Sequence, residues 1–142
     1  MNTWPIPNRK IENYPPIPPE IEKVGSIVLD SAYRVHTALG PGLLESAYEA
    51  CHAYEIRDHG LSVVTQVALP VIYREVKVEA GFRVDLLVEN CVIVEIKAVE
   101  KMNPVYQAQL LTYMKLSGIR LGYLINFNVP HLKDGGIKRM VV

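Results

Sequence analysis

Three charged side chains lie in apolar stretches that otherwise predict buried β-structure. Asp85 belongs to the run FRVDLLV, and Glu95 and Lys97 stand two residues apart in the run CVIVEIKAV. The β-branched residues of the second run, and its lack of Gly and Pro, indicate a strand buried on both faces, where a charge is expensive to place. Carboxylates held close together repel one another unless a proton or a cation lies between them, and their oxygens suit Mg²⁺ or Mn²⁺. These residues therefore predict a metal site with a neighbouring lysine.

The spacing of these residues predicts that they converge on one patch of a strand pair. Side chains two apart on a strand point the same way, so Glu95 and Lys97 share a face with Ile93. The opposite face of this strand carries Val92, Val94 and Ile96. In the preceding run the predicted faces are Phe82, Val84, Leu86 and Val88 on one side and Arg83, Asp85, Leu87 and Glu89 on the other. The link Glu89-Asn90 is short enough for a hairpin, which places Asp85 across from Glu95.

Two interpretations of this patch are open from the residues alone. In the first, the carboxylates bind a metal, and the lysine orients or deprotonates a water on that metal, the nucleophile that phosphodiester hydrolysis requires. In the second, Glu95 and Lys97 form a buried ion pair and Asp85 is an ordinary strand-end charge. Other segments must decide between them.

Three motifs together resemble a known group of proteins. Asp85 followed by Glu95-Ile96-Lys97 resembles the D…(D/E)xK signature of the PD-(D/E)xK nuclease superfamily, with Val84 where the proline of the name would stand. The segment GLLESAY, residues 42–48, is similar to the string of the GxxExxY family of small bacterial proteins. QLLTY, residues 109–113, fits the QxxxY element of related nucleases. The resemblance extends over nearly all of the chain from Ile21 onward.

The resemblance implies a role for each motif residue. By this resemblance Asp85, Glu95 and the Ile96 carbonyl bind Mg²⁺ or Mn²⁺, and Lys97 handles the attacking water. Glu45 is implied to be an additional acidic ligand, directly or through water. Gln109, Tyr113 and Tyr48 are implied to position the substrate. From the residues alone, Glu45 in a first helical turn would simply complement the helix dipole, and Tyr113 would be an aromatic residue at the core edge.

The predicted elements follow the order of this superfamily's core. Periodicity and terminators predict helices over residues 20–39 and 43–59, ending at Gly40 and Gly60, and a helix from Pro104, capped by Asn103, to Gly118. Strands are expected at 62–69, 71–73, 76–88 with an interruption near Gly81, 91–99, 121–127 and a last short one in GIKRMVV. We therefore expect an α/β fold, a restriction-endonuclease-like αβββαβ core with a mixed central sheet and an extra N-terminal helix. Gln66 is the polar exception in its strand, and we interpret it as an edge residue rather than a substrate contact.

Length and composition predict one domain preceded by an arm. The 142 residues are 49% hydrophobic, enough for a single core, which we place at residues 20–142. We expect residues 1–19 to form a proline-rich extended arm, in which Trp4, Ile6, Tyr14 and Ile17 interleave with prolines. The arm is either a loosely ordered tail or a segment that docks on its own domain, on a second copy of the chain or on another protein. No apolar stretch approaches membrane-spanning length, so a cytoplasmic protein with two free cysteines is expected.

The charge distribution leaves two functional classes. The net charge is zero, which argues against strong nonspecific binding to nucleic acid. The C-terminal third is basic, and its basic residues either face phosphates or are solvated surface charges. The first class is a metal-dependent nuclease acting on DNA, which we favour over RNA. The second is a nuclease-like nucleic-acid-binding or protein-assembly module without catalytic activity. The clustered acidic residues with the lysine favour the first class, because a scaffold needs no like charges together.

Overall fold

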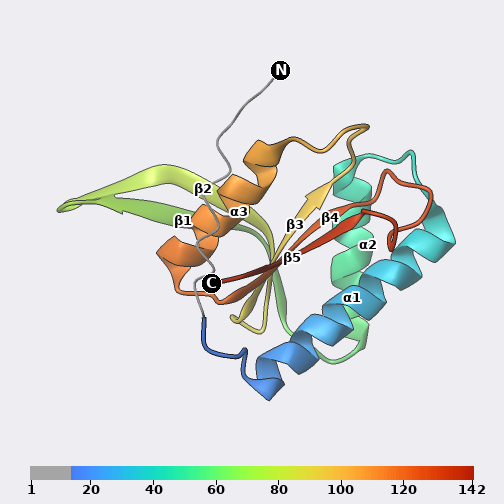
Figure 1. Ribbon diagram of the computed structural model, residues 1–142, viewed down its shortest axis with the longest axis horizontal. Helices are drawn as coiled ribbons and strands as arrows, with labels where there is room; N and C mark the ends of the chain where they lie inside the picture. Colours follow the sequence, from blue (N-terminus) through green and yellow to red (C-terminus); the bar gives the residue numbers. More distant parts are fainter. Residues whose placement is uncertain (1–13) are drawn as a thin grey trace.

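A computed structural model describes residues 14–142, which form one mixed five-stranded sheet flanked by helices (Figure 1). The elements in chain order are α1 (Pro19–Leu39), α2 (Glu45–Asp58), β1 (Val63–Tyr73), β2 (Val76–Val88), β3 (Val92–Lys97), α3 (Pro104–Ser117), β4 (Leu121–Asn126) and β5 (Ile137–Val141). The strands lie in the order β1-β2-β3-β4-β5, antiparallel except for β3 and β4. That parallel pair is joined through α3, the crossover that parallel strands need. The predicted αβββαβ order is therefore confirmed from α2 to β4, with α1 before it.

The helices cover both faces of the sheet because side chains alternate along its central strands. Val92, Val94 and Ile96 of β3 belong to the core cluster that contains the buried residues of α1 and α2. Ile93 belongs to a second cluster, built on Leu110 and Met114 of α3. The predicted division of faces along β3 is thus confirmed, and it puts the Glu95 face on the α3 side.

The division of faces predicted for β2 was wrong. Phe82 and Val84 pack with the α3 cluster, whereas Leu86 and Val88 pack with the α1 and α2 cluster. Strict alternation therefore breaks at Asp85. Alternation follows from a regular pleat, and the pleat is interrupted where side-chain groups replace strand-to-strand hydrogen bonds.

β1 is one strand rather than the two predicted, and β2 is not interrupted. Pro70 lies within β1. Proline has no backbone N–H to donate to a neighbouring strand, and an edge strand such as β1 tolerates that loss because one of its sides has no partner strand. The irregularity appears instead as a register shift between Leu69 and Val71. Gly81 of β2 faces this shift, where a Cβ atom would lie 2.5 Å from Val71 Cγ2. The glycine therefore permits a close approach of the two strands.

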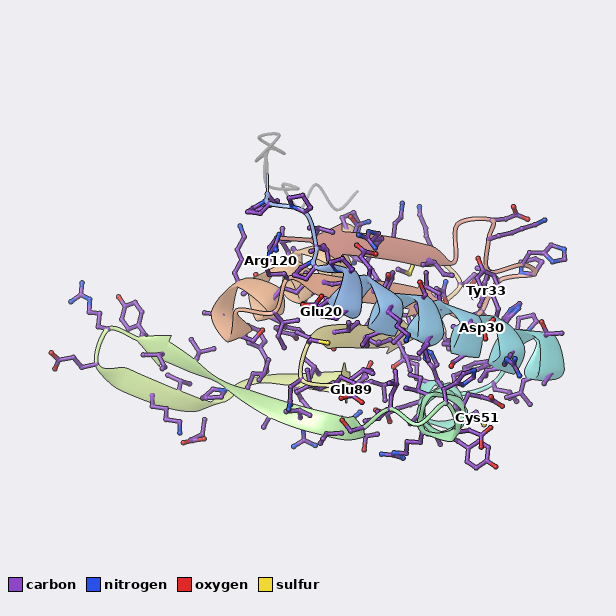
Figure 2. All side chains as sticks on the ribbon, turned by 90° about the horizontal axis from the view of Figure 1, so that it is seen from below. Glu20, Asp30, Tyr33, Cys51, Glu89 and Arg120 are labelled. Carbon is purple, nitrogen blue, oxygen red and sulfur yellow. The ribbon has the colours of Figure 1, made fainter. Side chains whose placement is uncertain are left out.

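Beyond this shift, the ends of β1 and β2 project from the body as a two-stranded ribbon (Figures 1 and 2). Tyr73 pairs with Val76, and Val71 pairs with Val78. Residues two apart on a strand share a face, so these four side chains form one apolar face of the ribbon. Tyr73 is 65% exposed and Val76 is 59% exposed.

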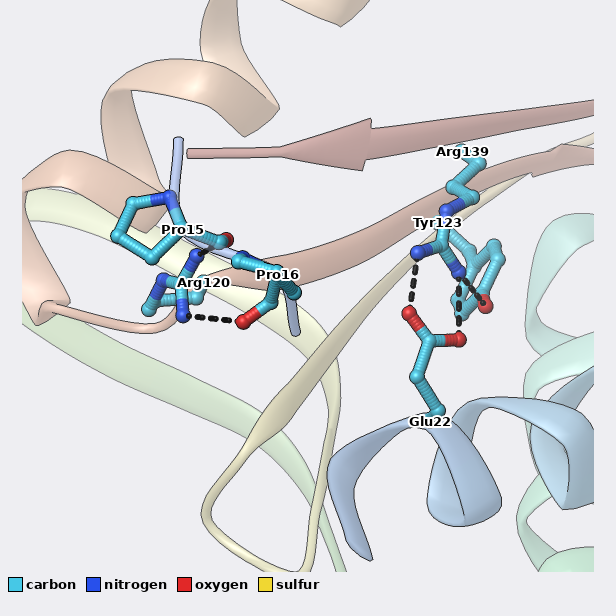
Figure 3. Close-up of polar contacts among 6 residues, drawn as sticks. All are labelled: Pro15, Pro16, Glu22, Arg120, Tyr123 and Arg139. Carbon is cyan, nitrogen blue, oxygen red and sulfur yellow. Dashed lines mark hydrogen bonds and ion pairs between the residues drawn. The ribbon is translucent and has the colours of Figure 1, made fainter. Parts of the chain in front are cut away.

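Two arginines fasten the start of the described chain to the sheet (Figure 3). The Arg120 guanidinium donates to the carbonyl oxygens of Pro15 and Pro16, and its Nε donates to Val142 O at 3.1 Å. Arg139 of β5 forms an ion pair with Glu22 of α1 and donates to Tyr123 Oη at 3.3 Å. The C-terminal part of the predicted arm thus contacts its own domain, while Trp4 and Ile6 lie outside the described residues. The division into an arm and a domain stays a prediction.

Two further features bear on the sequence predictions. Cys51 and Cys91 are both free cysteines. Within residues 14–142, no helix combines the length and the apolar character that crossing a membrane requires.

Candidate active site

The two predicted acidic residues face each other where β2 and β3 separate. The strands pair only through Leu86 with Val94, Leu87 with Ile93 and Val88 with Val92. At the next position Glu95 Oε1 accepts a hydrogen bond from Asp85 N at 3.1 Å, and Asp85 Oδ2 accepts one from Ile96 N at 2.7 Å. The carboxylates thus take the place of backbone carbonyls in the ladder. Their predicted position across from each other is confirmed.

Glu95 is an electrostatically unfavourable carboxylate in this position. Its side chain is 8% exposed, and burial is the main cause that raises its pKa from 4.5 to about 8. The negative charge of Asp85 adds to this rise, whereas the Asp85 N–H and the positive charge of Lys97 oppose it. A proton on one of the two carboxylates, or a cation between them, would therefore stabilise the pair, as expected for like charges in low dielectric.

Lys97 does not form the ion pair of the alternative interpretation. Within the described part of the chain, Lys97 takes part in no salt bridge. Its Nζ instead lies 4.5 Å from the centre of the Tyr106 ring on α3, within range of a cation–π interaction. The buried Glu95–Lys97 ion pair is therefore excluded. Sequence reasoning missed Tyr106, although its place three residues before Gln109 puts both on neighbouring turns of α3.

A small cavity opens on the α2 side of the acid pair. Its volume is about 240 Å³, and its lining consists of Glu45, Ser46, Glu49, Gln66, Asp85 and Ile96. Glu45 stands in the first turn of α2 and accepts a hydrogen bond from Ala98 N at 3.4 Å. The structure thus brings Glu45 to the end of β3, beside Asp85.

Gln66 reaches this cavity from β1. Its Nε2 donates to Glu49 Oε1 at 2.5 Å and to Asp85 Oδ1 at 3.2 Å. Burial raises the pKa of Glu49, and the Gln66 hydrogen bond acts against that rise. The interpretation of Gln66 as an edge residue is correct for its strand, because β1 lies at the sheet edge, but its side chain points at the acid pair. Glu49 could have been predicted as a site residue from the sequence, because it lies one helical turn after Glu45 and therefore on the same face of α2.

Tyr48 occupies a different place from the one expected of a substrate-positioning residue. It is fully buried, and its ring stacks on Phe127 with centroids 4.7 Å apart. Its hydroxyl donates to Gly40 O at 2.6 Å and accepts from Leu43 N at 3.1 Å. Tyr48 therefore holds the loop that leads into α2, and the prediction that it positions substrate was wrong. Gly42, with φ +104, supplies a backbone angle that other residues rarely adopt in this loop.

Gln109 and Tyr113 lie one turn apart on α3. Tyr113 packs its ring on Phe82 with centroids 4.1 Å apart. Burial raises the pKa of its hydroxyl, and the charges of Glu95 and Asp85 raise it further. Gln109 is exposed. Their substrate contacts stay a prediction.

The comparisons with known proteins agree with this geometry. The family model described as the PD-(D/E)XK nuclease superfamily matches residues 22–140, from α1 to β5. The chain belongs to the PD-(D/E)XK nuclease superfamily. No curated protein and no solved structure matches it significantly. Superfamily membership agrees with the mixed α/β, restriction-endonuclease-like fold. Membership in the narrower GxxExxY family stays a prediction.

The donor atoms at the acid pair fit the divalent metals that PD-(D/E)XK nucleases generally use. Among residues 14–142, no three His, Cys, Asp or Glu side chains gather into a group that could hold a metal. The acid pair supplies two carboxylates, and Ile96, whose amide donates to Asp85 Oδ2, lines the cavity beside Asp85. Such hard oxygen donors suit Mg²⁺ or Mn²⁺ rather than Zn²⁺, which favours nitrogen and sulfur. A cation would also favour the ionised form of Glu95, whose pKa is raised by burial and by the charge of Asp85.

Proposed function

We propose that this superfamily member hydrolyses phosphodiester bonds in nucleic acid, with Mg²⁺ or Mn²⁺ held by Asp85 and Glu95. The observation that carries the proposal is the exchange of hydrogen bonds between the two carboxylates and the Asp85 and Ile96 amides. It holds the buried carboxylate of Glu95 against the half-buried carboxylate of Asp85, which weakens a fold unless a cation or proton is supplied. A site that binds a divalent cation explains that arrangement.

The residues around the pair divide the work of metal binding. One oxygen of each carboxylate accepts a hydrogen bond from a backbone amide. The other oxygen of Glu95, Oε2, accepts no hydrogen bond from the described residues, so it is available to a metal. In the proposal Asp85, Glu95 and the Ile96 carbonyl hold the metal, and Glu45 contributes directly or through a water. When bound, such a metal polarises the phosphate and activates the attacking water.

Lys97 is the proposed acid–base residue. It extends from the same strand face as Glu95, and its Nζ lies over the Tyr106 ring instead of pairing with a carboxylate. A lysine that is not held in an ion pair with Glu95 is free to orient the attacking water as an ammonium, or to accept its proton as a neutral amine. Tyr106 thereby acts as a positioning residue for Lys97.

Substrate contacts are proposed on α3 and on the exposed basic residues. Gln109 is exposed on α3, one turn before Tyr113. Burial, and after it the charges of the acid pair, raise the pKa of the Tyr113 hydroxyl. Both residues are therefore proposed to position the nucleic acid. The basic C-terminal third offers fewer positive charges to phosphates than expected. Arg120 donates to the Pro16 carbonyl, and Arg139 forms an ion pair with Glu22. Lys115, Lys133 and Lys138 remain exposed. We propose DNA as the first substrate to test.

One observation favours the alternative of an assembly module without catalytic activity. The apolar face of the β1–β2 ribbon is exposed at Tyr73 and Val76, which is the type of surface that protein contacts cover. This surface lies away from the acid pair, so it leaves the proposed nuclease chemistry intact.

Metal binding and cleavage test the proposal together. Calorimetry should show Mn²⁺ binding to the wild type that is lost in Asp85→Ala and Glu95→Ala. Labelled single-stranded, duplex and branched DNA, and the equivalent RNAs, should be cleaved only with Mg²⁺ or Mn²⁺. The matched control is Glu75→Gln, an exposed carboxylate in the ribbon turn, which should behave as the wild type. Equal Mn²⁺ binding by the wild type and both alanine variants would exclude the proposed metal site. Metal binding without cleavage of any form would favour the assembly module.

A further inference from the structure

Gln66 joins two carboxylates that come from different elements. One terminal NH₂ group donates to Glu49 of α2 and to Asp85 of β2. Both partners are acceptors, so the NH₂ end of the amide must face them. An uncharged group with two donors satisfies both carboxylates without adding a cation that would compete with a metal.

The backbone at Gln66 departs from regular strand geometry to make this contact. Its φ is +53, a left-handed conformation that is rare for residues other than Gly, Asn and Asp. The neighbouring residues keep their partners, since Thr65 pairs with Leu86 and Val67 pairs with Val84. The distortion is therefore confined to one residue. Strain of this kind persists only where the surrounding contacts hold it, and it gathers at functional sites.

The contact completes the hydrogen bonding of Asp85. The Ile96 amide donates to Oδ2, and the Gln66 amide donates to Oδ1. A carboxylate with a donor on each oxygen cannot rotate freely, so its remaining lone pairs keep one direction. Glu49 in turn holds the Gln66 amide from the other side of the cavity.

We propose that Gln66 is a positioning residue for Asp85 and that Glu49 anchors Gln66. This inference rests on the proposed function, because Asp85 is positioned for the metal. It gives Glu49 a different role from Glu45: Glu49 acts through its hydrogen bond to an amide and does not bind the metal. Groups that orient a metal ligand typically contribute about 10- to 100-fold in metal affinity.

The experiment compares Mn²⁺ affinity and stability across four variants. Gln66→Ala should lower Mn²⁺ affinity by about 10- to 100-fold. Glu49→Ala should lower it as well, and Glu49→Gln should recover most of that loss because it keeps an oxygen that accepts the Gln66 N–H. Equal losses in Glu49→Ala and Glu49→Gln would show that the charge of Glu49 is needed and would overturn its anchoring role. Unchanged Mn²⁺ affinity in Gln66→Ala would overturn the positioning role.

Gln66→Gly separates positioning from a purely structural role. Glycine adopts the left-handed conformation without strain, so the melting temperature of the metal-free variant should equal or exceed that of the wild type. Its Mn²⁺ affinity should still fall as in Gln66→Ala. A lower melting temperature with wild-type affinity would show that Gln66 only joins β1 to α2.

A measurement without metal or substrate distinguishes failure of this inference from failure of the proposed function. In ¹⁵N NMR spectra of the metal-free protein, the proton signals of the Gln66 side-chain NH₂ should be shifted from those of a solvated glutamine, and they should move in Glu49→Ala. Signals like those of a solvated glutamine would overturn the inference. Absence of Mn²⁺ binding by the wild type, with the shifted signals present, would instead overturn the proposed function.

Discussion

Glu95 gives a quantitative test of how the acid pair behaves without a metal. Burial and the charge of Asp85 raise its pKa from 4.5 to about 8 in the folded protein. Between these values the unfolded chain has released the proton while the folded protein still holds it. The free energy of unfolding should therefore fall as pH rises through this window, by up to about 1.4 kcal/mol per pH unit for one proton. Above the folded pKa the effect levels off.

Glu95→Gln removes this proton linkage and keeps an oxygen that accepts the Asp85 N–H. In metal-free protein we expect the two free energies of unfolding to be similar near about pH 5. Near about pH 8 the variant should exceed the wild type by on the order of 3 kcal/mol. Urea denaturation with a chelator across this range measures the difference. Taking the difference between the two proteins cancels the titration of the other groups. Glu75→Gln, which changes an exposed carboxylate, should follow the wild type.

Mn²⁺ should reverse the order of the two proteins near about pH 8. A cation stabilises the ionised pair of the wild type, whereas the variant lacks the Glu95 carboxylate as a ligand. Parallel stability curves for the metal-free wild type and Glu95→Gln would refute the reasoning. They would mean that Glu95 ionises as readily in the folded protein as in the unfolded chain.

Three further predictions follow from the contacts of the site. Lys97→Ala should keep Mn²⁺ binding and lose about 10²- to 10⁴-fold in single-turnover cleavage, and unchanged cleavage would remove Lys97 from the chemistry. Tyr106→Leu should slow cleavage by roughly tenfold, because it removes the ring under the ammonium, while Tyr106→Phe should retain the rate. Equal rates for these two variants would contradict the positioning role of the ring. Tyr48→Phe should lower the free energy of unfolding by about 1 to 3 kcal/mol in urea titrations, because Gly40 O and Leu43 N lose their partner. A variant as stable as the wild type would show that water replaces the hydroxyl there.

Much of the fold and the acid pair could be predicted from the sequence because they depend on local periodicity. Alternation along CVIVEIKAV assigns Ile93, Glu95 and Lys97 to one face, and the packing of Ile93 beneath α3 agrees. A short turn after Glu89 leaves little freedom in register, so Asp85 faces Glu95. The order of helices and strands also follows from caps, glycines and apolar periods that act over a few residues.

The remaining features of the site depend on elements that are distant in the chain. Lys97 lies over Tyr106 because α3 packs on the sheet face of Glu95, and no spacing within β3 contains that contact. Tyr48 is buried because Phe127 of a later segment stacks on it.

The break at Asp85 and the left-handed backbone of Gln66 show the same dependence. They arise where three strands and α2 meet, as carboxylates replace backbone partners and one amide joins two elements. By itself the sequence determined which residues carry charge in the buried strands and which faces of β3 they share. Only the tertiary structure decided their partners, because hydrogen bonds and burial at this point come from segments that the chain brings together on folding.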